Sequence, residues 1–319
     1  MRIFVLGKRG GIVHWPEDCI AGLRAAGHEV SFGVTRHPGL NRSIERLLLA
    51  RWAGAPLATR LAGAIRRFEP DLILAIAPYH MPLAILRHVA SLAGRPPLIG
   101  WVGDVFAAAS ACAAGLFDAV GYTDSGLLAA HRQFGWATPS LYLPHAANPR
   151  LDHGIGDPAS RSQDMVFVAT PTPDRRALVE RVRTPMQLFG AGWAKSPPAH
   201  HTVHARQVGI DELASIYRSH LCALNIRNED NVRDGLNQRH FDPYLSATPV
   251  VSDDQPDLAR CFEPGAEILV YRDADELNDL YVRLRREPEI AARIGDMGRR
   301  RVMAEHTYER RLATLLSAA

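Results

Sequence analysis

Short apolar runs alternate with longer amphipathic segments along the first half of the chain. Such runs are typical of strands that are buried on both faces, and the segments between them have the period of helices packed on a sheet. The predicted strands are 2–6, 29–33, 72–76, 98–102, 119–122 and 140–143, and the predicted helices are 17–26, 42–68, 82–93, 107–114 and 126–134. This order predicts a parallel sheet with helices on both faces.

The same alternation returns in the second half, after a stretch at 152–164 with the Gly, Pro and Ser content of a linker. The predicted strands are 165–169, 186–189, 202–204, 222–225, 249–252 and 268–271, and the predicted helices are 174–183, 211–219, 236–246, 258–261, 274–286, 289–305 and a last one from Tyr308. We therefore predict an α/β protein with two doubly wound, Rossmann-like domains, 1–150 and 151–306, that face a cleft. A substrate on each domain is the layout of a transferase.

Composition excludes several classes of protein. The 319 residues are 47% hydrophobic and 22% charged, which is the balance of a globular chain, and a net charge of +3 is too small to indicate nucleic-acid binding. The four cysteines are far apart and form no CxxC pair, so neither a zinc site nor a disulfide framework is expected. The apolar run at the N-terminus is too short for a signal peptide, and no transmembrane helix is expected, so we predict a cytoplasmic protein.

A glycine turn follows the first strand, where doubly wound sheets bind ligands. Gly10 and Gly11 allow close backbone approach in this turn, and Lys8 and Arg9 could neutralise an anion. The turn lacks the spacing of the dinucleotide fingerprint and of the P-loop, so an ordinary tight turn is the alternative.

The charge-dense segment 225–242 follows a predicted strand and leads into a predicted helix. Arg227, Arg233 and Arg239 suit a diphosphate near that helix start, while Asn237 and Asp242 suit the hydroxyls of a sugar or ribose. The alternative is a solvated loop whose arginines pair with neighbouring acids, namely Glu229, Asp230 and Asp234.

Candidate catalytic residues lie in the first half. Asp104 follows the strand 98–102 and is a candidate base or acceptor contact, with capping of the next helix as the alternative. His14 follows the glycine turn and could face the cleft, with a partly buried and inert side chain as the alternative. His145 in the interdomain segment could contact a ligand or have a hydrogen-bonded structural role. No DxD-type pair stands out, so no metal site is expected.

The segment 42–68 is basic and amphipathic, with Pro56 as an interruption. We expect two helices joined by a turn at 54–56. The segment either packs on its own sheet or makes a peripheral contact with a membrane surface. The break at Pro56 would make it a flap over the acceptor side rather than one long anchor.

Several motifs between about Leu221 and Arg311 resemble the C-terminal domain of CgeB-like glycosyltransferases of the GT-B superfamily. They are Ala223–Arg227, Gly235–Asp242, Ala247–Asp253, Phe262–Glu267, Asp273–Leu277 and His306–Arg311. More loosely, Leu143–His145 resembles the interdomain segment of such enzymes, and Phe189–Trp193, with Gly190 and Gly192, resembles a glycine turn.

The resemblance implies a nucleotide-diphosphate-sugar donor on the C-terminal domain and a glycan, lipid or protein acceptor on the N-terminal domain. It assigns the pyrophosphate contact to Arg239 or Arg227 and the ribose contact to Asp242, where the family usually has the longer Glu. It also implies that the last helix, 307–319, returns to the N-terminal domain. Transfer would need no metal and no cofactor beyond the donor. The alternatives are a non-catalytic nucleotide- or sugar-binding protein and a nucleotide-sugar epimerase of the same fold.

Overall fold

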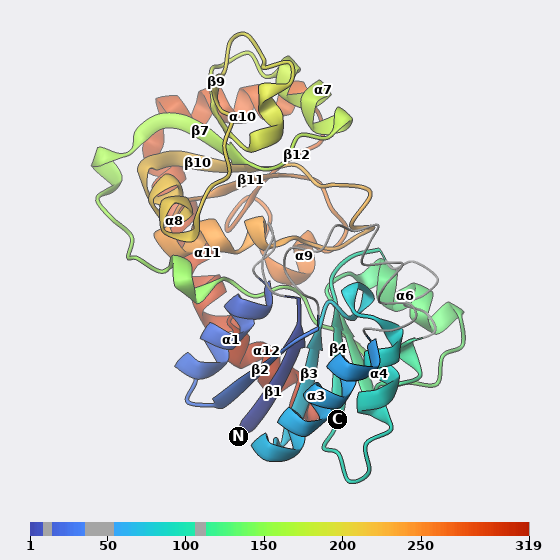
Figure 1. The fold of residues 1–319 in the computed structure, drawn as a ribbon. Coiled ribbons are helices and arrows are strands. Elements are labelled where there is room, and N and C mark those ends of the chain that lie inside the picture. The colour runs from blue at the N-terminus through green and yellow to red at the C-terminus, as the bar shows by residue number, and fades with distance from the viewer. Residues whose placement is uncertain (9–14, 36–53, 106–112, 319) are drawn as a thin grey trace. The chain divides into compact units, whose positions relative to one another are not determined.

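The computed structural model describes residues 1–8, 15–35, 54–105 and 113–318 (Figure 1). Its internal contacts divide the chain into two compact units. The first unit is Met1–Pro144 with Asn231–Asp234 and Tyr308–Ala319, and the second unit is His145–Asp230 with Gly235–Thr307. The sequence predicts the corresponding limits at residues 150 and 306.

The first unit contains a six-stranded parallel sheet in the order β2-β1-β3-β4-β5-β6. Its strands are β1 (Arg2–Gly7), β2 (Glu29–Val34), β3 (Leu72–Ile76), β4 (Leu98–Val102), β5 (Ala119–Tyr122) and β6 (Ser140–Tyr142). The helices described in this unit are α1 (Trp15–Ala25), α3 (Gly54–Phe68), α4 (Leu83–Ala90), α6 (Ser125–Gln133), α12 (Tyr308–Ala318) and the 3₁₀ turn η2 (Pro78–His80). The chain extends the sheet from β1 in both directions, so the strand order reverses between β1 and β3.

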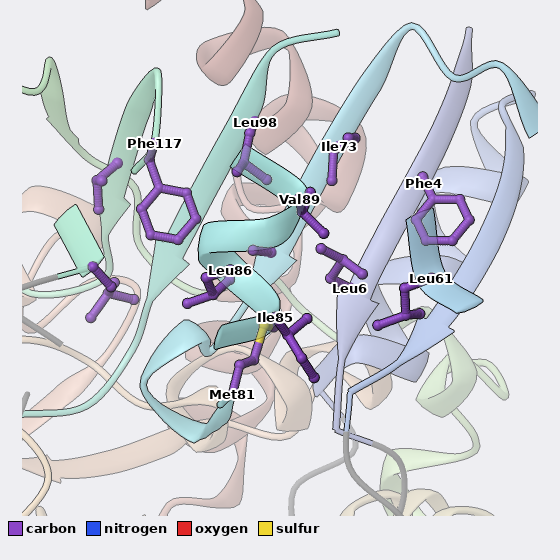
Figure 2. Close-up of a cluster of buried hydrophobic side chains, with 14 of the residues drawn as sticks. Phe4, Leu6, Leu61, Ile73, Met81, Ile85, Leu86, Val89, Leu98 and Phe117 are labelled. Carbon is purple, nitrogen blue, oxygen red and sulfur yellow. The ribbon is translucent and has the colours of Figure 1, made fainter. Parts of the chain in front are cut away.

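Alternate side chains of β1 enter the two layers of the first unit, as the two-residue period of a strand requires. Phe4 and Leu6 point toward Leu61 of α3 and the apolar side of α4 (Figure 2). Trp101 of β4 instead packs on Trp15 of α1, with the ring centroids 5.1 Å apart. Helices therefore cover both faces of the sheet, as the apolar pattern predicts.

Helix α12 packs within the first unit. Tyr308, Leu312 and Leu315 are buried, and the Tyr308 ring lies 6.0 Å from that of Trp101. A Cβ on Gly22 of α1 would lie 2.6 Å from the Tyr308 Cβ, so only glycine permits this approach. The end of the chain is thus part of this unit's core.

The second unit repeats the architecture with a parallel sheet in the order β12-β11-β10-β7-β8-β9. Its strands are β7 (Ser162–Val168), β8 (Gln187–Phe189), β9 (Thr202–His204), β10 (His220–Asn225), β11 (Val250–Asp253) and β12 (Leu269–Tyr271). Its helices are α7 (Pro173–Arg181), α8 (Ile210–Ser219), α9 (Leu258–Cys261), α10 (Ala274–Arg286) and α11 (Pro288–Glu305), and its 3₁₀ turns are η3 (Pro149–Leu151), η4 (Pro158–Ser160), η5 (Ala191–Ala194), η6 (Gln238–His240) and η7 (Asp242–Ser246). Here the strand order reverses between β7 and β10.

Two apolar layers cover the second sheet. Phe167 and Leu224 pack with Leu277 and Tyr281 of α10 on one face. Ala223 and Val250 pack with Tyr217 of α8 and with η7 on the other. The prediction of two parallel α/β sheets is confirmed.

The prediction of a helix over 236–246 is wrong. This stretch forms the 3₁₀ turns η6 and η7, and the chain then turns at Ala247, whose φ is 51°. Pro243 explains the break, because it has no N–H for the α-helical bond to the carbonyl of Arg239. No α-helix N-terminus therefore contributes to anion binding at this place.

The two helices predicted within 42–68 can be compared with the structure only from residue 54 onward, because 36–53 lie outside the described residues. Gly54–Pro56, the predicted turn, forms the start of α3, whose buried side chains, such as Leu57 and Leu61, pack on the sheet while Arg60 and Arg66 are exposed. The described part follows the packing alternative, and the membrane contact stays a prediction. The predicted helix 107–114 also falls largely outside the described residues. Within the described ranges, no helix is long and apolar enough to cross a membrane.

Candidate functional site

The carboxyl edge of the second sheet carries a buried arginine at the point where the strand order reverses. Arg175, in the first turn of α7, donates from Nη1 to the Thr170 carbonyl after β7 at 2.9 Å. Its Nε and Nη2 donate to the Ile226 carbonyl after β10 at 3.1 and 2.9 Å. Arg175 therefore holds together the two loops that border the expected ligand position.

Asn225, the last residue of β10, is the centre of a buried polar network. Its Oδ1 accepts from Asn237 Nδ2 at 3.0 Å and from Arg239 Nε at 3.3 Å. Its Nδ2 donates to Ser252 Oγ and to Asp253 Oδ1, both at 3.3 Å, at the end of the neighbouring strand β11. One amide thus fixes the segment 237–239 against two strand ends.

His240 is fully buried beneath this network. Its Nε2 lies 2.9 Å from Ser252 Oγ, and its Nδ1 lies 3.2 Å from the Asn237 backbone N–H. Burial lowers the pKa of His240 to about 3, so the imidazole is neutral at physiological pH. His240 thus accepts the Asn237 N–H, while Asn237 caps η6 by accepting the Arg239 N–H.

Asp253 is the carboxylate of this site. Its Oδ1 accepts from the Arg227 backbone N–H at 3.1 Å and from Gln255 Nε2 at 3.0 Å, and its Oδ2 lies 3.7 Å from Arg227 Nε. Burial raises the pKa of Asp253 above its usual value, against the effect of these donors. The Arg227 side chain also pairs with the exposed Glu229, as the surface-loop alternative expects.

Arg239 differs from Arg227 because it has no ion pair with any carboxylate in the described part of the chain. Within the described residues, its side chain makes one hydrogen bond, from Nε to the Asn225 amide oxygen. Burial lowers the pKa of Arg239, and the charge on Arg239 helps burial to lower the pKa of Arg175 to about 9. Two guanidinium groups thus lie close together. The Asp253 carboxylate is near both of them, and the Asp242 carboxylate is near Arg239. This arrangement suits an added anion.

Asp242, predicted to hold a ribose, is buried at the start of η7. Its Oδ1 accepts from the Asn148 backbone N–H at 2.9 Å, which ties η7 to the segment that leads into η3. Its charge also favours the protonated form of Arg239. Asp242 therefore has a structural contact, and the ribose contact stays a prediction.

The predicted glycine turn follows β8. Gly190 has a φ of 147°, and a Cβ at this position would lie 2.4 Å from the Ala169 carbonyl oxygen. A Cβ on Gly192 would lie 2.8 Å from Pro171. The two glycines are thus required for packing against the loop after β7, and their donor contact stays a prediction.

At the carboxyl edge of the first sheet, Asp104 lies just after β4. The Tyr79 hydroxyl, just after β3, donates to Asp104 Oδ2 at 3.0 Å. Burial raises the pKa of Asp104, and the hydrogen bond from Tyr79 opposes that increase. A carboxylate whose pKa is raised toward neutrality is suited to accept a proton. Capping of the following helix cannot be compared, because 106–112 lie outside the described residues.

The remaining predicted residues are not all brought together. Gly10, Gly11 and His14 lie outside the described residues. Arg233 belongs to the first unit, where its backbone N–H donates to Asp124 Oδ2 at 2.7 Å and its side chain is exposed. Its grouping with Arg227 and Arg239 therefore stays a prediction.

His145 belongs to the second unit and is buried, near enough to His240 to lower the pKa of that residue. Its contact with a ligand stays a prediction. Among the described residues, no group of three or more His, Cys, Asp or Glu side chains is arranged to hold a metal ion.

Sequence reasoning assigned no binding or catalytic role to several polar residues of these edges. They are Tyr79 in the first unit and Arg175, Asn225, His240, Ser252, Asp253 and Gln255 in the second. Most lie at or just after the end of a strand, and this position was the available signal.

Comparisons with known proteins agree with this architecture. Residues 175–317 match a protein-family model described as "Glycosyl transferase-like". A search of curated proteins gives no match. Among solved structures, the sucrose-phosphate synthase tll1590 from Thermosynechococcus elongatus has a TM-score of 0.70 at 14% identity, covering 99% of this chain and 97% of that chain.

Two further solved structures are similar over nearly the whole chain. Anabaena Alr3699/HepE in complex with UDP and glucose has a TM-score of 0.68 at 14% identity, with 100% of both chains covered. AviGT4, a glycosyltransferase involved in avilamycin A biosynthesis, has a TM-score of 0.59 at 14% identity, covering 99% of this chain and 96% of that chain. The fold is therefore the GT-B fold of two Rossmann-like sheets, and residues 175–317 are similar to the glycosyl transferase-like family model.

Proposed function

We propose that this protein transfers a glycosyl group from a nucleotide-diphosphate sugar to a hydroxyl group of a glycan, lipid or protein. The donor is held by the carboxyl edge of the second sheet, and the acceptor by that of the first. The observation that carries the proposal is the Arg239 guanidinium, which has no ion pair with a described carboxylate and lies close to a second buried guanidinium, that of Arg175.

The diphosphate is the part of the donor that these residues bind. Arg239 and Arg227 provide guanidinium N–H donors, and each hydrogen bond to a charged phosphate oxygen contributes about 1.5 to 3 kcal/mol. Arg175 keeps its bonds to the two loop carbonyls and adds positive charge. We assign the ribose contact to the Asp242 carboxylate, whose Oδ1 also accepts the Asn148 backbone N–H.

The reaction follows from these roles. The oxygen of the acceptor hydroxyl forms a bond to the anomeric carbon, and the bond from that carbon to the diphosphate oxygen breaks, leaving its electron pair on the diphosphate. Arg227 and Arg239 stabilise the resulting charge, so that no metal is required for it. Asp104 contacts the acceptor hydroxyl and takes its proton.

The CgeB-like subtype is the finer assignment within this proposal. It rests on the motif Gly235–Asp242 and on the position of Asp242 after an aromatic residue, Phe241. The complexes of HepE with UDP and with UDP-glucose make UDP-glucose the first donor to test.

The experiment is an assay of nucleotide release with a panel of nucleotide sugars. The full-length protein is incubated with UDP-, GDP-, ADP- and dTDP-sugars, with and without an extract of glycans and lipids as acceptor. We expect release of nucleotide from one donor class and a loss of that release in the double variant Arg227→Gln/Arg239→Gln. Donor binding without release would indicate a binding protein, and conversion of the sugar without its transfer would indicate an epimerase. Either result would overturn the proposal.

A further inference from the structure

The Tyr79 hydroxyl is held in place by the backbone of the neighbouring strand end. Tyr79 lies in η2, which begins after Ala77, a residue with a φ of 52° in the left-handed region. The Ala77 N–H donates to the Trp101 carbonyl of β4 at 2.9 Å. A strained residue and a backbone bond to the neighbouring strand thus bring the Tyr79 hydroxyl to Asp104.

The two carboxylate oxygens of Asp104 differ in their contacts. Oδ2 accepts from the Tyr79 hydroxyl at 3.0 Å. Oδ1 has no hydrogen-bond donor in the part of the chain that the structure describes. Asp104 is only partly buried, at the carboxyl edge where doubly wound sheets bind their ligands. Oδ1 is therefore the oxygen available to a substrate.

Other charged or titratable groups also lie on the elements next to Asp104. On the β3 side there is His80 of η2, and on the β5 side there are Asp124, Arg233 and Asp234. Asp124 already accepts the backbone N–H groups of Arg233 and Asp234. Among all these groups, Tyr79 is the one that changes the pKa of Asp104, in addition to burial.

We propose that Tyr79 is a positioning residue for Asp104. Its hydroxyl donates a hydrogen bond to Asp104 Oδ2, which fixes the plane of the carboxylate and stabilises the ionised form of Asp104. Oδ1 then accepts the hydrogen of the acceptor hydroxyl. This inference rests on the proposed function, because it concerns how the acceptor side of that reaction is prepared. It assigns a role to a residue that sequence reasoning missed.

The test compares Tyr79→Phe with the wild type across pH 5 to 9. Without the hydroxyl, the carboxylate loses a donor, so the pKa of Asp104 rises and the acid limb of the kcat/KM profile moves to higher pH. We expect a movement of roughly half to one pH unit. On the acid limb, this movement lowers kcat/KM about three- to tenfold, with a smaller loss at pH 9. The matched control is Tyr122→Phe, which removes a hydroxyl of the same unit that contacts His131 and leaves Asp104 unchanged.

A second measurement does not depend on turnover. The protein is labelled with ¹³C at the aspartate carboxyl carbons, and the Asp104 resonance is assigned as the one that is missing from Asp104→Asn. The pH midpoint of the titration of this resonance should rise in Tyr79→Phe and remain at the wild-type value in Tyr122→Phe. Tyr79→Gln, whose amide can donate to the same oxygen, should recover part of the difference and provides a second folded variant.

The outcomes separate this inference from the proposed function. If the Asp104 midpoint moves in a protein that releases no nucleotide, the pairing is supported and the glycosyltransferase assignment of this chain fails. If the wild type transfers a sugar while neither the pH profile nor the resonance moves in Tyr79→Phe, Tyr79 is a structural residue and the inference is overturned.

Discussion

The carboxyl edges of the two sheets differ in how their polar side chains are held in place. At the edge of the second sheet, the Asn225 side chain joins the ends of β10 and β11 to Asn237 and Arg239. At the edge of the first sheet, Asp104 has one side-chain partner among the described residues, Tyr79. A densely bonded edge holds several cationic groups in fixed positions, as a diphosphate requires, whereas a single pair leaves a carboxylate oxygen available for a proton. This difference is the basis of our proposal that one edge binds the leaving group and the other accepts the proton.

Asp104→Asn should have the largest effect on turnover. The amide cannot take a proton, so we expect kcat to fall by about 10² to 10⁴, while the dissociation constant of the nucleotide stays within about twofold. Steady-state kinetics and calorimetry measure the two quantities. A variant with near wild-type kcat would remove Asp104 from the reaction.

The same variant should not lose stability at neutral pH. Because the pKa of Asp104 is raised in the folded protein, the folded state binds this proton more tightly than the unfolded state does. The stability that this group contributes is therefore lost as pH rises from the pKa of Asp104 in the unfolded chain toward its higher pKa in the folded protein. Asp104→Asn lacks this loss, so its Tm at pH 7.5 should equal or exceed that of the wild type. A clear decrease in Tm would contradict the effect of burial on this group.

Tyr308→Ala should destabilise the first unit and leave nucleotide binding by the second unit nearly unchanged. Loss of this buried ring beside Trp101 leaves a cavity, and we expect a cost of about 3 to 5 kcal/mol in the unfolding free energy of the first unit. Nucleotide binding by the second unit should change less than threefold. Denaturant unfolding followed by tryptophan fluorescence, together with calorimetry, provides the comparison. Parallel loss of stability and nucleotide binding would show that the second unit depends on α12.

His240→Gln should change how stability depends on pH. In the wild type, the pKa of His240 is about 3 in the folded protein and near 6.5 when unfolded, so stability is present above pH 6.5 and is lost as pH falls toward 3. This loss should be about 1 kcal/mol for each pH unit below 6.5. The variant should be less stable at pH 7.5 by about 1 to 3 kcal/mol, because Ser252 and Asn237 lose a buried partner, and its stability should depend less on pH. Equal slopes between pH 6.5 and 4.5 would show that another group causes the loss.

Sequence periodicity predicted the elements that are fixed by apolar pattern alone. The strands β3, β4 and β5 begin and end at the predicted residues, because each is a short apolar run between turn residues. The error at 236–246 came from treating an apolar segment as a helix despite Pro243, whose effect on the backbone exceeds that of the pattern.

The candidate site was predicted only in part, because its contacts join residues that are distant in sequence. Arg227, Asn237 and Arg239 lie within one loop, and their chemistry is visible in the sequence. Arg175 reaches the Ile226 carbonyl, 51 positions away, through the reversal of strand order between β7 and β10. Tyr79 and Asp104 meet because β3 and β4 pair in parallel. These contacts depend on strand order, which local periodicity does not specify.

The binding of a diphosphate by Arg239 is the central claim, and titration calorimetry tests it most directly. UDP and uridine are titrated into the wild type, into Arg239→Gln, and into Arg286→Gln as the control, which removes an exposed arginine of α10. Loss of about 1.5 to 3 kcal/mol of charge-assisted bonding should weaken UDP binding by roughly 10- to 150-fold, leave uridine binding within about threefold, and change neither in the control. Equal weakening of UDP and uridine in Arg239→Gln, or no weakening of either, would contradict the account.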